Sequence, residues 1–236
     1  MKDILEVIEK IRIANSKEEL TAIIDEVASI IGLEYYLLGY TSAESMTSPS
    51  TTIIDNYPPK WRETYEKEKL AQHDPTVDYC LNQNAPIIWE QLNCAPLKRD
   101  QKNVMCRAND YGLKTGFSIP LHGVHSEFGM FSFGSSEQEK SPSFEAIQKA
   151  QIIAPALMDK FKDFDERVGI NLTKREKECL LWVSEGKSSW EISIIIGCSE
   201  RTVVFHLGNA TNKLVCTNRY QAVSKAIIIG LIRPMI

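Results

Sequence analysis

Residues 172–214 read LTKREKECLLWVSEGKSSWEISIIIGCSERTVVFHLGNATNKL, and the spacing within this stretch decides how the C-terminal part of the chain folds. Thr173 and Ser188 each stand three residues before a glutamate, which is the capping-box signature of a helix start. Gly186 and Gly197 follow apolar runs and suit helix ends. A further helical repeat begins near residue 217, so the sequence predicts four short helices in this part of the chain.

The third predicted helix, roughly residues 200–214, follows a tight turn that contains a glycine. Two short helices joined by such a turn are typical of a helix-turn-helix, whose second helix enters the major groove of DNA. Val203, Leu207 and Leu214 would then face the core. The polar side chains suited to base edges and phosphates are Arg201, Thr202, His206, Asn209 and Asn212. A helical bundle that binds protein is the alternative that spacing alone leaves open.

The net charge of −4 is divided unevenly along the 236 residues, a length that suits two domains. Residues 171–236 carry nine Lys and Arg against five Glu and no Asp, whereas residues 1–170 carry 18 basic and 26 acidic side chains. A basic module on an acidic body suits phosphate contact at one end of the chain only.

The six cysteines are scattered, with no CxxC pair and no paired Cys/His spacing. This pattern argues against a zinc site and a disulfide scaffold, and it fits a reducing cytoplasm. The charged N-terminus does not resemble a signal peptide, and no apolar run reaches the ~20 residues needed to cross a bilayer. We therefore expect a cytoplasmic protein without metal, cofactor or membrane partner.

The N-terminal part mixes helical and strand patterns. Helical periodicity covers the first 31 residues, and further helices are expected after the prolines at 58–59 and 75, over about 96–111 and from 141–142 to about 164. Strand patterns occur at 35–40, 51–54, 87–89, 116–121 and 128–133, with 41–50 expected as a loop. This order implies an antiparallel sheet flanked by helices on both sides. The expected fold class is α+β, with an α/β/α sandwich over residues 1–164, a linker over 165–171 and a four-helix module over 172–236.

Residues 57–89 hold an unusual set of aromatic and polar side chains: Tyr57, Trp61, Arg62, Tyr65, Asp74, Thr76 and Trp89. A pocket for an amphiphilic small molecule combines apolar walls with a few placed polar groups. An indole N–H and a phenol donate to carbonyl oxygens, and a carboxylate accepts from an amide N–H. The alternative is that the aromatic residues are core and that Asp74 caps a short helix.

No enzyme site emerges from the sequence. The four histidines lack partners at metal-ligand spacing, and no G-x-S-x-G elbow is present. Asp74 and Ser132 alone make no catalytic triad. The alternating βα pattern of a phosphorylated receiver domain is also missing. We therefore expect a binding protein rather than an enzyme.

Two sets of motifs resemble a known family. The runs at 172–178, 186–188, 191–193, 199–203 and 205–206 resemble the helix-turn-helix of LuxR-type regulators. The runs at 56–65, 73–77, 86–89 and 112–120 resemble the acyl-homoserine-lactone-binding domain of LuxR-type quorum-sensing regulators. Within the family, Arg62, Thr76 and the run at 120–123 are most similar to LasR-type members. The resemblance covers nearly the whole chain.

The resemblance implies residue roles. Trp61 would donate to the lactone carbonyl, Asp74 would accept the amide N–H, and Tyr57 and Ser132 would bind the amide carbonyl. Arg62 would approach a 3-oxo group through water. Further residues would line the head-group site and the acyl tunnel: Leu37, Gly39, Ile53, Tyr65, Thr76, Val77, Trp89 and Leu113. In the DNA-binding module it adds Lys187, Ser188, Ser199 and Lys213 to the polar residues named above.

Two departures from the family pattern qualify these roles. Val204 stands where many members carry a basic residue, so Arg201 and Lys213 become the main positive charges of the DNA-reading helix. Val104 and Met105 stand where relatives carry bulky aromatics near the head group. The expected function is ligand-gated transcriptional regulation by a homodimer on palindromic double-stranded DNA. An orphan receptor for a foreign or non-lactone signal, and a regulator controlled by a protein partner, remain the alternatives.

Overall fold

The computed structural model describes residues 2–45, 47–93, 96–123, 127–163 and 170–234. It forms two units, one that combines helices with a sheet and one that is helical at the C-terminus, and each is described by itself. Most of the expected linker, residues 165–169, lies outside the described residues, as does residue 164. The proposed domain boundaries therefore stay a prediction.

The first unit is built on one five-stranded sheet with the order β2-β1-β5-β4-β3. Its strands are β1 (Tyr35–Ser45), β2 (Ser48–Asp55), β3 (Ile87–Ile88), β4 (Thr115–His122) and β5 (Phe128–Ser135). The pairs β1/β5, β4/β5 and β3/β4 are antiparallel. The expected antiparallel sheet is confirmed.

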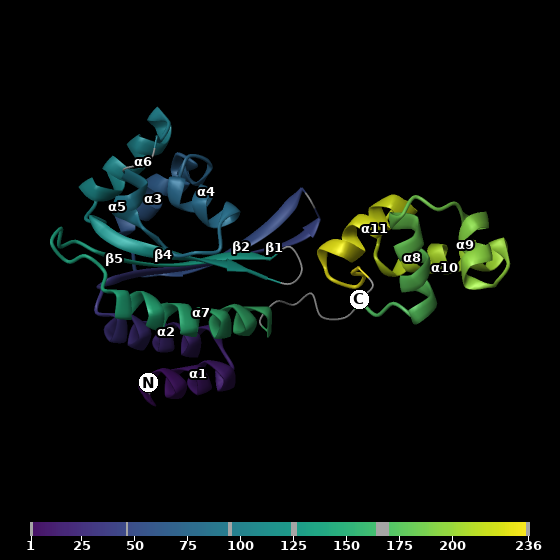
Figure 1. The fold of residues 1–236 in the computed structure, drawn as a ribbon, viewed down its shortest axis with the longest axis horizontal. Coiled ribbons are helices and arrows are strands. Elements are labelled where there is room, and N and C mark those ends of the chain that lie inside the picture. Colours follow the sequence, from purple (N-terminus) through teal and green to yellow (C-terminus); the bar gives the residue numbers. More distant parts are fainter. Residues whose placement is uncertain (1, 46, 94–95, 124–126, 164–169, 235–236) are drawn as a thin grey trace. The chain divides into compact units, whose positions relative to one another are not determined.

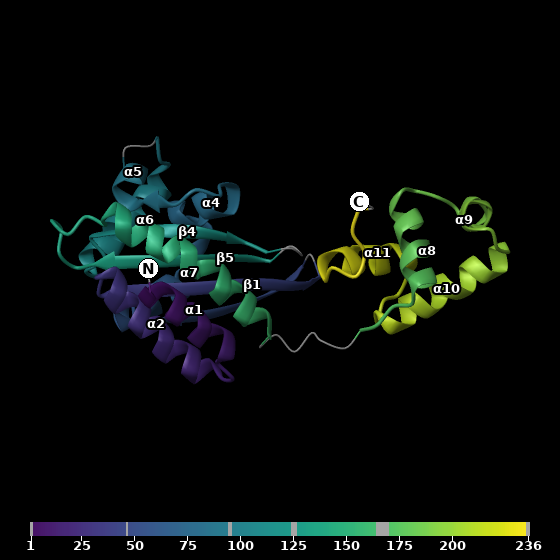
Figure 2. The same cartoon turned by 60° about the horizontal axis from the view of Figure 1, so that its bottom comes forward.

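Helices cover both faces of this sheet (Figure 1). One face carries α1 (Lys2–Ile13), α2 (Lys17–Ile31) and α7 (Phe144–Asp163), and Figure 2 shows α1 and α2 alongside α7. The other face carries α3 (Pro59–Lys67), α4 (Pro75–Asn82), α5 (Trp89–Asn93) and α6 (Arg99–Asp110), with a 3₁₀ turn at Leu70–Gln72. The expected α/β/α sandwich is thus confirmed.

The two faces of the sheet differ because successive side chains of a strand point to opposite sides. Tyr36 and Leu38 of β1 enter the main apolar core with α1, α2 and α7. Leu37, which lies between them, joins a smaller cluster with Tyr57 and Trp61 on the opposite face. The sheet therefore separates a filled core from a second compartment beneath α3 to α6.

Two details of the sequence prediction were wrong. Residues 41–50 were expected as a loop, but β1 and β2 extend through most of this segment. The segment lacks the apolar alternation of a half-buried strand because most of β2 is exposed, whereas its Thr and Ser residues suit an extended backbone. Trp89 was expected in a strand, but it begins α5 directly after β3.

The C-terminal unit contains the four expected helices, α8 (Lys174–Ser184), α9 (Ser189–Ile196), α10 (Glu200–Lys213) and α11 (Arg219–Ile228). The capping boxes at Thr173 and Ser188 are both formed, and Ser199 caps α10. Gly197 ends α9 with φ +68°, a backbone conformation that favours glycine, so the chain turns at once into α10. The helix-turn-helix follows from this local chemistry.

The core of this unit agrees with the expectation for α10, because Val203, Leu207 and Leu214 are all buried. Ile195 of α9 lies in the apolar run before Gly197, but its side chain is 44% exposed. Only Ile192, Ser193 and Ile196 of this short helix are buried, so the core contacts a narrower face of α9 than its isoleucine content suggested.

Within the described residues, none of the helices has the length and apolarity needed to cross a membrane.

Candidate functional site

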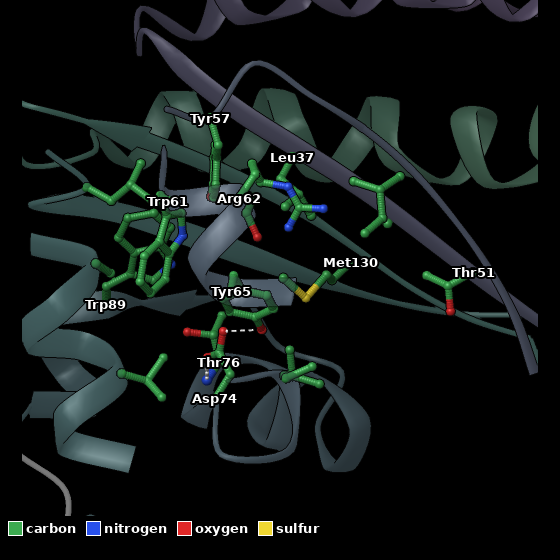
Figure 3. Close-up of a pocket in the computed structure, with 18 of the residues that line it drawn as sticks. Leu37, Thr51, Tyr57, Trp61, Arg62, Tyr65, Asp74, Thr76, Trp89 and Met130 are labelled. Carbon is green, nitrogen blue, oxygen red and sulfur yellow. Dashed lines mark hydrogen bonds between the residues drawn. The ribbon is translucent and has the colours of Figure 1, made fainter. Parts of the chain in front are cut away.

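A cavity of about 220 Å³ lies in the second compartment, between the sheet and the helices α3 to α6 (Figure 3). Most of its lining is apolar, and polar groups from several elements reach it. The structure brings all the residues that were expected to bind a ligand to this one cavity: Leu37, Gly39, Ile53, Tyr57, Trp61, Arg62, Tyr65, Asp74, Thr76, Val77, Trp89, Leu113 and Ser132. Their contact with a ligand stays a prediction.

Asp74 combines both roles that the sequence left open for it, because it caps α4 and also lines the cavity. Its Oδ1 accepts the backbone N–H of Thr76 at 2.8 Å, and its Oδ2 accepts the hydroxyl of Tyr65 at 2.8 Å. Burial raises the pKa of this carboxyl, and the bonds from Tyr65 and Thr76 oppose the rise. Two carboxylate oxygens offer about four lone-pair sites, so capacity remains for an N–H or O–H in the cavity.

Hydrogen-bond donors face the cavity beside Asp74. The Trp61 indole is 3% exposed and lines the cavity. Burial, and next the charge of Asp74, raise the pKa of the Tyr57 phenol, so its hydroxyl stays protonated. Ser132 is 1% exposed and also lines the cavity. The cavity can therefore offer several O–H and N–H donors next to one carboxylate acceptor.

Arg62 lines the cavity, but its guanidinium forms ion pairs with two carboxylates that do not line the cavity. Its Nε lies 3.1 Å from Oδ2 of Asp55, and its Nη2 lies 3.2 Å from Oε1 of Glu66. The guanidinium carbon lies 5.9 Å from the centre of the Tyr65 ring. Its charge is thus already balanced by two carboxylates, which suits an indirect contact through water more than a direct ion pair with a ligand.

Several lining residues were missed or not assigned a role by the sequence analysis. The hydroxyls of Thr41 and Thr51 lie 3.0 Å apart on β1 and β2, and Figure 3 places Thr51 far from Trp89. Strand alternation could have predicted Thr41 and Met130, because side chains two residues apart on a strand point to the same face. Thr41 is two residues from Gly39, and Met130 is two residues from Ser132. The remaining lining residues are Thr51, Ala71, Val104, Met105, Ala108 and Phe128.

The second candidate site is the exposed surface of α10. Arg201 is exposed and makes no ion pair within the described part of the chain, while Thr202, His206 and Asn209 are half-buried. Lys187 is half-buried, and Ser188 and Ser199 serve as helix caps. Val204 and Phe205, which were not expected to contribute, are 56% and 62% exposed. The DNA contacts of all these residues stay predictions.

Lys213 has a partner that the sequence did not reveal. Its Nζ lies 2.8 Å from Oε2 of Glu176, a side chain that is only 3% exposed. The same oxygen accepts the backbone N–H of Thr173 at 2.7 Å. Lys213 therefore joins the end of α10 to the start of α8, which gives it a structural role beside the expected phosphate contact.

The geometry of the cavity supports binding of a small molecule. Among the described residues, no group of three or more His, Cys, Asp or Glu side chains could hold a metal ion. A largely apolar cavity with convergent polar groups, followed in the chain by a helix-turn-helix, defines a ligand-responsive transcriptional regulator.

Comparison with known proteins agrees with this class. Residues 16–161 match the autoinducer binding domain family, and residues 170–226 match the bacterial regulatory proteins of the luxR family. The transcriptional activator protein LuxR of Aliivibrio fischeri is 42% identical over 232 residues, which cover 96% of this chain and 93% of the relative. VanR of Vibrio anguillarum, also a transcriptional activator protein, is 38% identical over 99% of both chains.

Solved structures show the same fold. A crystal structure of Escherichia coli SdiA matches with a TM-score of 0.82, 26% identity and coverage of 99% of both chains. SdiA in complex with octanoyl-rac-glycerol matches with a TM-score of 0.81, 25% identity and coverage of 98% of this chain and 95% of that one. The chain belongs to the LuxR family of quorum-sensing transcriptional regulators, which are not enzymes. The nearer similarity to LasR-type members stays a prediction.

Proposed function

We propose that the protein is a cytoplasmic receptor that binds an N-acyl homoserine lactone in the cavity and, as a homodimer, a palindromic DNA site. The observation that carries the ligand assignment is the meeting of Tyr57, Trp61, Asp74 and Ser132 at a largely apolar cavity. Such a ligand has an amide N–H that needs an acceptor, carbonyl oxygens that need donors, and an alkyl chain that needs apolar walls.

Each part of the ligand has a candidate partner. The carboxylate of Asp74 accepts the amide N–H, and the Trp61 indole donates to the lactone carbonyl. Tyr57 and Ser132 donate to the amide carbonyl, and Arg62 meets a 3-oxo group through water. The acyl chain extends toward Leu37, Ile53 and other apolar lining residues. The family resemblance and the common cavity of these residues support this arrangement.

Ligand binding would control DNA binding by mass action. A ligand that binds only the folded dimer stabilises that state by a free energy that grows with the logarithm of its concentration above the Kd. The dimer carries two DNA-binding modules, and each module has a modest excess of positive charge. Linking two weak modules raises their combined affinity for a site with matching symmetry.

The ligand assignment is tested by identifying what the protein retains. The full chain is produced with and without a mixture of N-acyl homoserine lactones, purified, extracted with organic solvent and examined by mass spectrometry. Recovery of an acyl lactone in equimolar amount with the protein supports the proposal. A stable dimer that contains no ligand and binds DNA under both conditions supports control by a protein partner instead.

A second candidate ligand class is an acyl compound without a lactone. The SdiA complex contains octanoyl-rac-glycerol, whose ester carbonyl and hydroxyl groups differ from those of a lactone. The aliphatic Val104 and thioether Met105 at the cavity leave space and adaptability for another head group. Competition of a monoacylglycerol against an acyl lactone in the purified protein distinguishes the two classes by relative affinity.

The DNA assignment predicts a change in salt dependence for Arg201→Ala. Each phosphate contact contributes about −0.9 to the slope of log affinity against log salt concentration. We expect the slope to become shallower by about 1 per module if Arg201 contacts a phosphate. The measurement is fluorescence anisotropy of labelled DNA over a salt series.

Arg175→Ala is the matched control for this measurement, because Arg175 is an exposed arginine of α8 that pairs with Glu178 at 2.8 Å. It removes the same charge from the module. Equal slopes for the Arg201 variant and the unmodified protein would contradict the assigned phosphate contact.

A further inference from the structure

A buried row of hydrogen bonds leads from Trp89 into the cavity. The Trp89 indole Nε1 donates to Oγ of Ser118 at 3.0 Å, and Oγ of Ser118 lies 2.7 Å from Oγ of Ser132. Ser118 and Ser132 are direct partners in the register of β4 and β5. Their side chains are 0% and 1% exposed, so water does not compete for these bonds.

The chemistry of the three groups gives this row one direction. An indole N–H only donates, so Ser118 must accept from it. The Ser118 hydroxyl then has one proton to donate, and among the described residues its only acceptor is Ser132. Ser132 thereby accepts from Ser118, and its own proton is free to point at a further acceptor. Ser132 lines the cavity, so a group of a bound ligand can supply that acceptor.

A pair of glycines fixes the indole that starts the row. Gly116 and Gly134 are partners on β4 and β5. A Cβ on Gly134 would lie 2.8 Å from Cη2 of Trp89, and a Cβ on Gly116 would lie 2.7 Å from Cζ3 of Trp89. Side chains do not approach a Cβ this closely, so the ring can lie against the strands only because both residues are glycine.

We propose that Trp89 and Ser118, seated by the Gly116–Gly134 pair, are positioning residues that orient Ser132 as a donor to a carbonyl oxygen of the ligand. This inference rests on the proposed acyl ligand and extends it. Trp89 acts through its N–H as well as forming the wall of the cavity. Hydrogen bonds that polarise one another in a dry interior strengthen the last donor of the row, which is the one that meets the ligand.

The row is tested with Ser118→Ala, Trp89→Phe and Ser132→Ala, alone and in pairs, in the full-length protein. Ser118→Ala removes one oxygen atom, and Trp89→Phe keeps an aromatic wall while it removes the N–H. We expect each to weaken binding of an N-acyl homoserine lactone by about tenfold or less. In the Ser132→Ala background their effects should largely vanish, because residues of one network are not additive.

A ligand pair gives a readout that loss of packing does not produce. An N-thioacyl homoserine lactone carries sulfur, a weaker acceptor, in place of the amide oxygen. The unmodified protein should prefer the oxygen ligand, and Ser118→Ala and Trp89→Phe should reduce that preference. This ratio of affinities does not depend on the fraction of protein that is folded. An unchanged ratio in both variants, with additive effects in the pairs, overturns the positioning role.

The glycine seat has its own test. Gly134→Ala should weaken binding when Trp89 is present, because the new Cβ displaces the ring edge. In the Trp89→Phe background the same substitution should have little further effect, since phenylalanine lacks the outer ring. If Gly134→Ala weakens ligand binding equally with Trp89 and with phenylalanine at position 89, the proposed role of the glycine pair in positioning Trp89 is refuted. An unmodified protein that binds neither an acyl lactone nor a monoacylglycerol would instead refute the proposed function, on which this inference depends.

Discussion

Asp74→Asn is expected to weaken binding of an N-acyl homoserine lactone by about 1.5–3 kcal/mol, the contribution of a hydrogen bond to a charged group. The substitution leaves one acceptor oxygen at a group to which Tyr65 and Thr76 donate and to which the ligand would donate as well. Asparagine caps a helix about as well as aspartate, so α4 should persist. Isothermal titration of the purified full-length variant measures the change.

Asp78→Asn is the matched control, because Asp78 lies on the same helix with its side chain exposed. It should bind the lactone like the unmodified protein. If Asp74→Asn retains full affinity, or if Asp78→Asn loses as much, Asp74 does not accept from the ligand.

The pH dependence of binding gives a second view of Asp74. Burial raises the pKa of this carboxyl in the free protein. A ligand N–H that donates to the ionised form would lower the pKa again, so binding would release a proton. By linkage, affinity should be constant above the raised pKa and should fall as the pH drops through it. Asp74→Asn should remove this dependence, which separates Asp74 from other titrating groups.

The sequence predicted best those features that local chemistry determines. Thr173, Ser188 and Asp74 were each expected to start a helix, and each accepts the backbone N–H that defines its cap. These bonds join residues two or three positions apart, so no knowledge of the tertiary fold is needed. The cavity residues near Tyr57 were noticed because aromatic and polar types are concentrated there in the sequence, and the family resemblance then assigned them to a ligand.

Features that depend on pairing between distant segments were not predicted. Ser118 meets Ser132 only because of the register between β4 and β5, and nothing in either strand alone indicates it. The extension of β1 past Tyr40 and the start of β2 at Ser48 were missed because this polar segment carries no apolar alternation. Lys213 was predicted to contact DNA, and its ion pair was not predicted, because its partner Glu176 stands 37 residues earlier in the sequence.

The pairing of Lys213 with Glu176 leads to an expected loss of stability in the C-terminal unit. Lys213→Met leaves a carboxylate that is 3% exposed and that keeps, among the described residues, the Thr173 N–H as its donor. We expect this to cost about 1.5–3 kcal/mol, as for a lost hydrogen bond to a buried charge. Adding Glu176→Gln should recover part of the loss, because removing both charges leaves none unpaired. Thermal unfolding followed by circular dichroism measures both effects.

Lys174→Met is the control that separates stability from DNA contact, since Lys174 is exposed and makes no ion pair within the described residues. Both lysine variants remove one positive charge from the module. If Lys213 mainly contacts phosphate, Lys213→Met should make the salt slope of DNA binding shallower than Lys174→Met does and should leave unfolding unchanged. That result would contradict the structural role.

Acid unfolding tests the same pair without a substitution. Burial alone would raise the pKa of Glu176, but the hydrogen bonds from Lys213 and Thr173 outweigh it and hold the pKa below its ordinary value of 4.5. A carboxyl whose pKa is lower in the folded state contributes stability that is complete above its unfolded pKa and is lost as the pH falls through the folded one. The unmodified protein should therefore lose stability below about pH 4.5 more steeply than Glu176→Gln/Lys213→Met. The DNA-reading helix α10 would then depend on Glu176 for its attachment to α8 before it can contribute any contact to DNA.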